Sequence, residues 1–224
     1  MMQGAHSRFD FGTMAEGYDR WYETPGGSIH DGRQKSIVRR VLPPSAVGAA
    51  LLDVGCGTGH WSRFFSSLGY RVFGVDLSPE MAHQARCNDQ THGPVAVADA
   101  GVLPFRSGTF DVVAAVAVIE FVIHLDAVIS ELVRCVRSNG AILVGTLNRL
   151  ARLNRDRVTA GKEPYCSACL LSPPELEDLL APIGTVEMQT TAPDVPGGED
   201  GTFVVAIVHL QPGEAAAGPH GGTG

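Results

Sequence analysis

A glycine-rich turn directly after a short apolar run is the feature that most constrains the fold of this chain. Residues 51–54 (LLDV) read as a buried strand, and residues 55–59 (GCGTG) follow without a spacer. A helix is predicted from about residue 59 to 68, with one apolar face. Glycines let a ligand approach the backbone, and the helix N-terminus attracts an anion. The segment therefore predicts an α/β fold with a ligand at this turn; a tight turn without a ligand is the alternative.

Strands and helices continue to alternate after this turn. Ser78 and Pro79 predict the start of a helix, another is predicted over 125–136, and Ser138-Asn139-Gly140 is predicted to stop it. The strands predicted next lie at 71–75, 94–98, 110–118 and 141–146. This alternation is typical of a doubly wound, mostly parallel sheet.

The flanking segments complete the expected architecture. Strands at 185–191 and 202–210, joined by a turn at 193–201, predict an antiparallel C-terminal hairpin and bring the sheet to seven strands. A helix with a Ser cap is predicted over 172–180. N-terminal helices are predicted at 13–23 and 30–42.

Composition and length set the limits of the expected organisation. Residues 1–210 are predicted to form a single domain, with residues 1–8 loose and without chemistry and 211–224 a disordered tail. The 17 Lys and Arg residues against 24 Asp and Glu residues give a net charge of -7, which disfavours nucleic acid as a partner. No apolar run is long enough for a membrane helix, so we expect a cytoplasmic protein without a membrane partner.

Cysteines offer neither a disulfide framework nor a metal site. The five cysteines are irregularly spaced, and Cys166 and Cys169 form a lone C-x-x-C pair without a second pair. We therefore expect no metal.

Two acidic residues follow neighbouring predicted strands. Asp76 ends the second strand, where a carboxylate can accept hydrogen bonds from a ribose diol. A helix N-terminal acid is the alternative role for Asp76. Asp99 follows the third strand, where it could take an adenine amine or simply form a turn.

These segments resemble a known enzyme family. VGCGTG, GVDLSPEM, ADAGVLPF, FDVVAAVAVIEF and ELVRCVRSNGAILV, in this order, resemble the class I S-adenosylmethionine-dependent methyltransferases, in their compact type 11-like form. The resemblance implies a Rossmann-like fold and S-adenosyl-L-methionine as cofactor, with S-adenosyl-L-homocysteine as product. It implies methyl transfer to a small-molecule acceptor by in-line displacement. The dinucleotide pattern G-x-G-x-x-G would place its third glycine at His60, which argues against an NAD-dependent enzyme.

The resemblance also implies a set of cofactor-binding residues. Asp53 would order the glycine turn, Asp76 would bind the ribose and Asp99 would face the adenine. The full set comprises Tyr18, Trp21, Asp53, Gly55, Cys56, Gly57, Gly59, Asp76, Leu77, Asp99, Ala100, Val116 and Ala117. Docking of the N-terminal helix onto the sheet is an alternative role for the aromatic members, and close packing is the alternative for Cys56.

No general base follows from the sequence. Many relatives carry a His directly after the Glu that follows the fourth strand, and this chain has Phe121 after Glu120. His124, His60 and His30 are the remaining candidates for a catalytic role, each with a structural role as its alternative. A cofactor-binding or partner module that has lost turnover is therefore the alternative function.

Residues 147–171 are expected to form a lid over the acceptor. Five of the 17 basic residues fall within this stretch, which favours an anionic acceptor; a solvated basic helix is the alternative. These residues are Arg149, Arg152, Arg155, Arg157 and Lys162.

Overall fold

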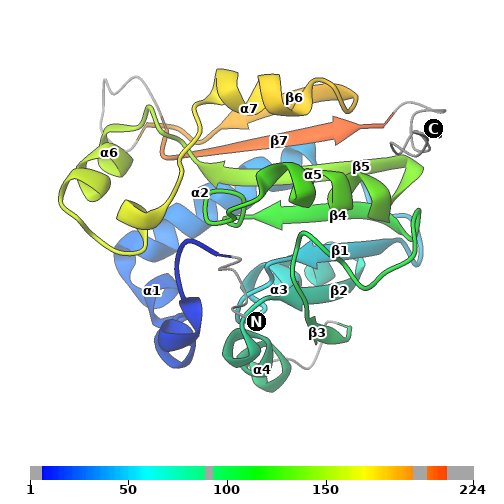
Figure 1. The fold of residues 1–224 in the computed structure, drawn as a ribbon, viewed down its shortest axis with the longest axis horizontal. Coiled ribbons are helices and arrows are strands. Elements are labelled where there is room, and N and C mark those ends of the chain that lie inside the picture. Colours follow the sequence, from blue (N-terminus) through cyan, green and yellow to red (C-terminus); the bar gives the residue numbers. More distant parts are fainter. Residues whose placement is uncertain (1–6, 89–92, 194–200, 211–224) are drawn as a thin grey trace, which may run out of the picture.

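Strand order in the sheet is β3-β2-β1-β4-β5-β7-β6, and only β7 runs against its neighbours (Figure 1). The computed structural model describes residues 7–88, 93–193 and 201–210. The strands are β1 Ala50–Val54, β2 Arg71–Asp76, β3 Val95–Val97, β4 Phe110–Val116, β5 Val136–Leu147, β6 Thr185–Thr190 and β7 Phe203–His209. The expected seven-stranded, mostly parallel Rossmann-like sheet with an antiparallel C-terminal hairpin is confirmed.

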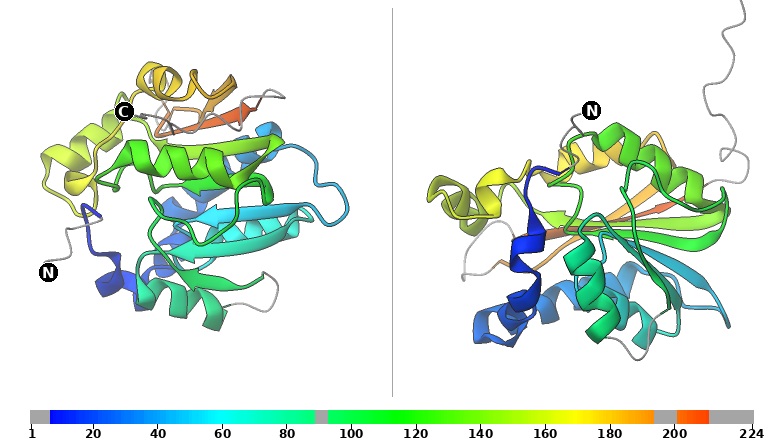
Figure 2. Two further views of the ribbon diagram at one scale, coloured as in Figure 1. Left: turned by 45° about the vertical axis from the view of Figure 1, so that its right-hand side comes forward. Right: turned by 60° about the horizontal axis from the view of Figure 1, so that its bottom comes forward.

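Helices cover both faces of the sheet (Figure 2). Helices α2, α3 and α4 lie on one face, and α5 and α7 lie on the other. The helices are α1 Arg20–Glu23, α2 Pro25–Val41, α3 His60–Ser67, α4 Pro79–Asn88, α5 Leu125–Cys135, α6 Arg152–Thr159 and α7 Pro173–Leu180, with 3-10 turns η1 Phe11–Gly17 and η2 Tyr165–Ser167.

Side chains of the central strands alternate between two cores. On one face, Leu52 and Val113 pack with Leu132 of α5 and Leu180 of α7. On the other face, the strands pack with Phe65 of α3 and with residues of α2. Burial on both faces explains why β4 reads as a continuous apolar run.

The expected stop at Ser138-Asn139-Gly140 is wrong, because these residues lie inside β5. Helix α5 ends earlier, at Cys135, because Val136 has an extended backbone conformation. The pairing of β4 with β5 shifts from Phe110↔Val136 to Val112↔Ala141. Residues 137–140 therefore form an irregularity in the pairing of these two strands. A side chain at Gly140 would lie 2.6 Å from the Asp111 carbonyl oxygen, which is why a glycine stands there.

The N-terminal region also differs from expectation. Residues 7 and 8 are not loose: Ser7 forms an antiparallel bridge with Val122, and the Arg8 amide donates to the Phe121 carbonyl at 2.7 Å. The helix expected at 13–23 is divided into η1 and α1, and α2 begins at Pro25, five residues before the expected start at 30. Thr24 caps α2 by accepting from the Gly27 amide at 3.0 Å. The tail 211–224 and most of the turn expected at 193–201 lie outside the described residues.

The carboxyl ends of the parallel strands point to one end of the molecule, on the left in Figure 1. The N-terminal segment, residues 7–23 with η1 and α1, and the region around α6 lie at the same end, and Figure 2 shows the N-terminal segment crossing it. Ligands of open α/β sheets bind at this end. Among the described residues, no helix has the length and apolar character to cross a membrane.

Leu132→Ala should lower the free energy of unfolding by about 2–5 kcal/mol, because Leu132 is fully buried between α5 and the sheet. Chemical denaturation measures this loss. Val102→Ala is the control: Val102 is 75% exposed, so its truncation should change stability by less than about 0.5 kcal/mol. Equal effects of the two substitutions would contradict the assigned core.

Candidate functional site

A cavity opens at the carboxyl ends of β1, β2 and β4. About 700 Å³ of empty space, part of it open solvent, lies among its lining residues. Its lining residues are Ser7, Phe11, Tyr18, Val54, Gly55, Gly57, Val75, Asp76, Leu77, Met81, Ala98, Asp99, Ala100, Ala117, Val118, Phe121 and Val122. Eight of these belong to the thirteen residues that the sequence singled out for cofactor binding.

The glycine turn forms the floor of the cavity. Gly55, Gly57 and Gly59 have φ values of 69°, 54° and 83°, a region that L side chains rarely adopt. A Cβ at Gly55 would lie 2.3 Å from Val118, whereas one at Gly57 would meet nothing within 4 Å. Gly57 therefore leaves open space beside its backbone, which a ligand could fill.

Asp76 lies between the glycine turn and the next helix. Its Oδ2 accepts from the Gly57 amide at 2.8 Å, and its Oδ1 accepts from the Ser78 amide at 2.9 Å. Burial raises the pKa of Asp76 even though both amides favour the ionised form. Each carboxylate oxygen keeps a further lone pair for a ligand hydroxyl.

Asp99 and Ala100 line the cavity after β3. The Asp99 side chain accepts from the Gly101 amide at 2.8 Å, so it also forms the turn that the sequence allowed as an alternative. The adjacent Leu77 is 40% exposed and completes this side of the cavity.

The end of β4 carries a strained backbone. Ala117 has a φ of 56°, the only positive φ among described residues other than glycine, and its amide donates to the Gly145 carbonyl at 2.8 Å. This turn ends the strand at Val116, two residues before the expected end at 118. It places Ala117 and Val118 in the cavity wall, while Val116 is buried behind them.

Five of the predicted residues do not line the cavity: Trp21, Asp53, Cys56, Gly59 and Val116. The Trp21 ring lies over His30 with a centroid distance of 6.3 Å. Cys56 is packed against β2, where a Cβ at Gly74 would lie 2.9 Å from its sulfur. Gly59 is the N-cap residue of α3.

Asp53 holds the helix that follows the glycine turn. It is buried, and it accepts from the Ser62 hydroxyl of α3 at 2.6 Å. Burial raises the pKa of Asp53 to about 7. The acid therefore fixes α3 beneath the turn and stands behind the cavity wall.

Aromatic rings of the N-terminal segment close the cavity. Phe11 packs edge-on against Phe121 with centroids 4.8 Å apart, and Tyr18 lies 6.4 Å from Phe11. Phe121 occupies the position of the family His, so in this chain that position anchors the N-terminal segment. The sequence analysis did not identify Ser7, Phe11 or Phe121 as cavity residues. The aromatic residues at both ends of residues 9–11 were the sequence feature that could have indicated a role for Phe11.

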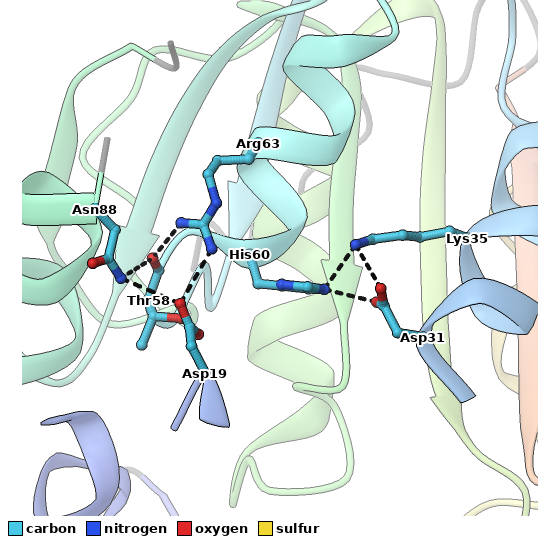
Figure 3. A network of polar contacts seen from close by, with 7 residues as sticks. All are labelled: Asp19, Asp31, Lys35, Thr58, His60, Arg63 and Asn88. Carbon is cyan, nitrogen blue, oxygen red and sulfur yellow. Dashed lines mark hydrogen bonds and ion pairs between the residues drawn. The ribbon is translucent and has the colours of Figure 1, made fainter. Parts of the chain in front are cut away.

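Two groups of polar contacts join the N-terminal segment and α2 to the glycine turn and α3 (Figure 3). In the first, His60 Nε2 lies 2.7 Å from Asp31 Oδ1 and 2.8 Å from Lys35 Nζ. Burial opposes ionisation of Asp31, but its hydrogen bonds with His60 and Lys35 hold its pKa below the ordinary value. The Tyr22 ring stacks on His60 with a centroid distance of 3.5 Å.

The second group is centred on Asp19 (Figure 3). The Asp19 carboxylate accepts from the Thr58 hydroxyl, from Arg63 at 3.2 Å and from Asn88 at 3.3 Å. These partners belong to the glycine turn, α3 and α4. The N-terminal segment is thus tied to three elements around the cavity.

The three His candidates lie away from the cavity wall. His60 belongs to the fastening network, and His30 stacks on Trp21. His124 is exposed at the N-cap of α5 and makes no side-chain capping bond there. The geometry therefore gives these residues structural or peripheral positions.

Glu120 is a buried acid that the sequence analysis did not single out. It is fully buried, its Oε1 accepts from the Leu147 amide at 3.3 Å, and its Oε2 has no hydrogen-bond partner among the described residues. Burial raises the pKa of Glu120 to about 7. Buried carboxyls with raised pKa values cluster at functional sites.

Residues 147–171 contain α6 and η2, and α6 lies at the end of the molecule to which the parallel strands point (Figure 1). Two of their basic residues form ion pairs: Arg149 with Glu175 at 2.6 Å and Arg152 with Asp156 at 3.6 Å. Arg157 lies over the Tyr165 ring, 4.5 Å from its centroid, with no carboxylate at ion-pair distance among the described residues. Within those residues, no cluster of three or more His, Cys, Asp or Glu side chains is arranged for a metal.

Comparison with known proteins finds similar methyltransferases. Residues 52–144 match the model of a methyltransferase-domain family. The chain is 34% identical over 116 residues to malonyl-acyl-carrier-protein O-methyltransferase of Serratia marcescens, covering 51% of this chain and 45% of that protein. It is 36% identical over 77 residues to the 18S rRNA (guanine-N7)-methyltransferase of Schizosaccharomyces pombe, covering 34% of this chain and 29% of that protein.

The fold is shared with solved structures. An S-adenosylmethionine-dependent methyltransferase from Thermotoga maritima superposes with a TM-score of 0.72 and 24% identity, covering 90% of this chain and 98% of that chain. By contrast, the chain covers about half or less of the length of the two curated relatives described above.

Asp53→Asn should make stability less dependent on pH. The raised pKa of Asp53 means that the folded state keeps a proton that the unfolded state loses from about pH 4 upward. This difference lowers stability as pH rises from about 4 to 7. Thermal unfolding at pH 5 and pH 7.5 should therefore show a smaller fall in Tm for Asp53→Asn than for the unsubstituted protein. The exposed Asp178→Asn serves as the control and should follow the unsubstituted protein; an equal fall for Asp53→Asn would refute the buried-acid assignment.

Proposed function

We propose that this chain is a class I S-adenosylmethionine-dependent methyltransferase, which transfers a methyl group from this cofactor to a small-molecule acceptor by in-line displacement. The observation that carries the proposal is the convergence of three strand ends on one cavity. The glycine turn, Asp76 and Asp99 with Ala100 all line it.

The donor set of the cavity fits a nucleoside with a charged sulfur substituent. Asp76 keeps acceptor lone pairs that suit a ribose diol, and Asp99 with Ala100 suits an adenine edge. The open space beside Gly57 suits the methionine portion. We therefore assign these residues, together with Gly55, Leu77, Ala117 and Tyr18, to cofactor binding.

The residues of this chain act mainly by orientation and exclusion of water. When bound, the cofactor supplies a methyl group on a positively charged sulfur, which needs no further activation. The glycine turn and Asp76 fix the position of the cofactor, while Phe11, Tyr18 and Phe121 cover it with aromatic rings. Alignment of three reacting atoms in a closed cavity can provide much of the rate enhancement.

We propose a small acceptor with an anionic group. The net charge of -7 supports a small molecule over a nucleic acid. Arg149 and Arg152 form ion pairs, whereas Arg155, Arg157 and Lys162 have no carboxylate at ion-pair distance among the described residues. Of these three, Arg157 is held over the Tyr165 ring. Its planar guanidinium suits a carboxylate or phosphate at the end of the acceptor distant from the methyl group.

A cofactor-binding module without turnover is the second candidate. Phe121 in place of the family His favours it, as does the position of all three His candidates outside the cavity wall. Incubation with S-adenosylmethionine and a panel of hydroxyl, amine and thiol acceptors separates the two functions. Formation of S-adenosylhomocysteine that depends on the acceptor supports the enzyme, and binding without turnover across the panel supports the module.

Asp76→Asn should weaken S-adenosylmethionine binding by about 10- to 100-fold, because the substitution removes a charged partner of the ribose hydroxyls. Calorimetric titration with S-adenosylmethionine and S-adenosylhomocysteine measures the change, with NAD as the negative ligand. The exposed Asp178→Asn is the matched control and should bind as the unsubstituted protein does. Unchanged affinity in a folded Asp76→Asn protein would remove the ribose assignment.

A further inference from the structure

Thr58, in the middle of the glycine turn, is held by polar contacts of both its side chain and its backbone. The residue is buried, and its hydroxyl donates to Asp19 of the N-terminal segment. Its carbonyl oxygen accepts from Arg63 of α3 at 3.0 Å and from Asn88 of α4 at 3.4 Å. Thr58 is therefore the residue at which the N-terminal segment, α3 and α4 meet the glycine turn (Figure 3).

The Asp19 carboxylate binds the same three residues. Its Oδ1 accepts from the Thr58 hydroxyl, and its Oδ2 accepts from Arg63 at 3.2 Å and from Asn88 at 3.3 Å. Arg63 and Asn88 thus each donate both to Asp19 and to the Thr58 carbonyl. We call Asp19, Thr58, Arg63 and Asn88 the Asp19 cluster. Of these four residues, Asp19 alone belongs to the N-terminal segment, so its carboxylate is what joins that segment to the other three.

The Asp19 cluster is adjacent in sequence to two residues of the cavity wall. Gly57, which lines the cavity, directly precedes Thr58, and Tyr18, which also lines it, directly precedes Asp19. Tyr18 and Asp19 both have right-handed helical backbone angles, with Tyr18 at the end of η1 and Asp19 at the start of α1. Because consecutive Cα atoms are separated by a fixed distance of about 3.8 Å, a displacement of Asp19 would carry Tyr18 with it. The contact between Asp19 and Thr58 therefore limits how far Tyr18 can move from Gly57.

We propose that Asp19 is a positioning residue, which holds Tyr18 over the cofactor by binding the glycine turn through Thr58. This inference rests on the proposed function, which assigns both Tyr18 and the space beside Gly57 to cofactor binding. Tyr18 is the residue in contact with the cofactor, and Asp19 acts through it. The Asp19 cluster then slows the departure of the cofactor from the cavity.

The chemistry of the Asp19 cluster suits a contact that forms and breaks. The Asp19 and Arg63 side chains remain 34% and 31% exposed, so water can replace their partners when the contact opens. The Thr58 hydroxyl is buried instead, and it would lose its acceptor on opening, which favours the joined arrangement. An enzyme that exchanges product for new cofactor needs both properties in the segment that covers the cavity.

Isosteric substitutions test the contact from both of its ends. Asp19→Asn removes the charge that binds Arg63, and Thr58→Val removes the hydroxyl while keeping the shape of the side chain. Each should raise the dissociation rate of S-adenosylhomocysteine by about 3- to 10-fold, because each weakens a charged but partly exposed contact. Thr58→Ser keeps the hydroxyl and is the matched control, with a dissociation rate close to that of the unsubstituted protein. Surface plasmon resonance on the immobilised protein measures these rates.

Coupling with Tyr18 distinguishes positioning from a general loosening of the fold. Tyr18→Ala removes the ring that Asp19 holds, so Asp19→Asn should change the dissociation rate little in a Tyr18→Ala protein. Asp31→Asn is the comparison, because Asp31 also binds α3, through His60 at 2.7 Å, but lies on α2 and is not adjacent to Tyr18. Asp31→Asn should therefore change the rate by the same factor with and without the Tyr18 ring.

Failure of this inference and failure of the proposed function give different results. An unchanged dissociation rate in folded Asp19→Asn and Thr58→Val proteins would overturn the positioning role, and so would an equal rise in Thr58→Ser and Thr58→Val. It would also be overturned if Asp19→Asn raised the rate by the same factor with and without the Tyr18 ring. In these cases the ligand still binds, and the proposed function stands. If neither S-adenosylmethionine nor S-adenosylhomocysteine binds the unsubstituted protein, the proposed function fails, and this inference fails with it.

Discussion

The left-handed backbone of the glycine turn is the constraint on which the site depends. Gly55, Gly57 and Gly59 bend the chain from β1 into α3 within five residues, and the Gly57 amide points to the Asp76 carboxylate of the neighbouring strand. This bond joins two strand ends that are distant in sequence. The same turn provides the open floor of the cavity, and Asp53 holds the following helix through Ser62. A side chain at Gly55 would be strained by its φ and would also meet Val118.

A second constraint comes from the N-terminal segment, which forms the wall that the sheet cannot provide. It carries Phe11 and Tyr18 into the cavity, and it is held there by aromatic contacts of Phe11 with Phe121 and by polar contacts to the glycine turn and α3. Asp31 and Asp19 each join side chains from different elements. Such partly exposed polar contacts are individually weak compared with core packing, so this segment is the element best suited to open for ligand exchange.

The sequence predicted the sheet well because its central strands are buried on both faces and end at glycine or acidic residues. It also placed Gly55, Gly57, Asp76 and Asp99 at one end of the sheet, since parallel strands share that edge. The sequence analysis expected Val116 and Ala117 in the cavity wall, whereas Ala117 and Val118 lie there. No local sequence feature indicates the positive φ of Ala117, which causes this shift.

Long-range contacts explain the other differences. The roles of Ser7 and Phe11 depend on contacts with residues 121 and 122, more than 100 positions away. Gly140 resembled a helix stop because its close contact with the Asp111 carbonyl is invisible in the sequence. Glu120 appeared only as a neighbour of Phe121, although its burial and its unpartnered oxygen set it apart.

The acids around the cavity oppose the stability of the fold and suit a cationic ligand. Burial raises the pKa values of Asp53, Asp76 and Glu120, so ionisation of each is disfavoured in the folded state. Neutral side chains of similar shape would remove that cost. Of these acids, Asp76 lines the cavity, where a positively charged sulfur would favour its ionised form and a neutral sulfur would not. Methyl transfer removes the charge from sulfur, so the proposed reaction would be coupled to the protonation of Asp76.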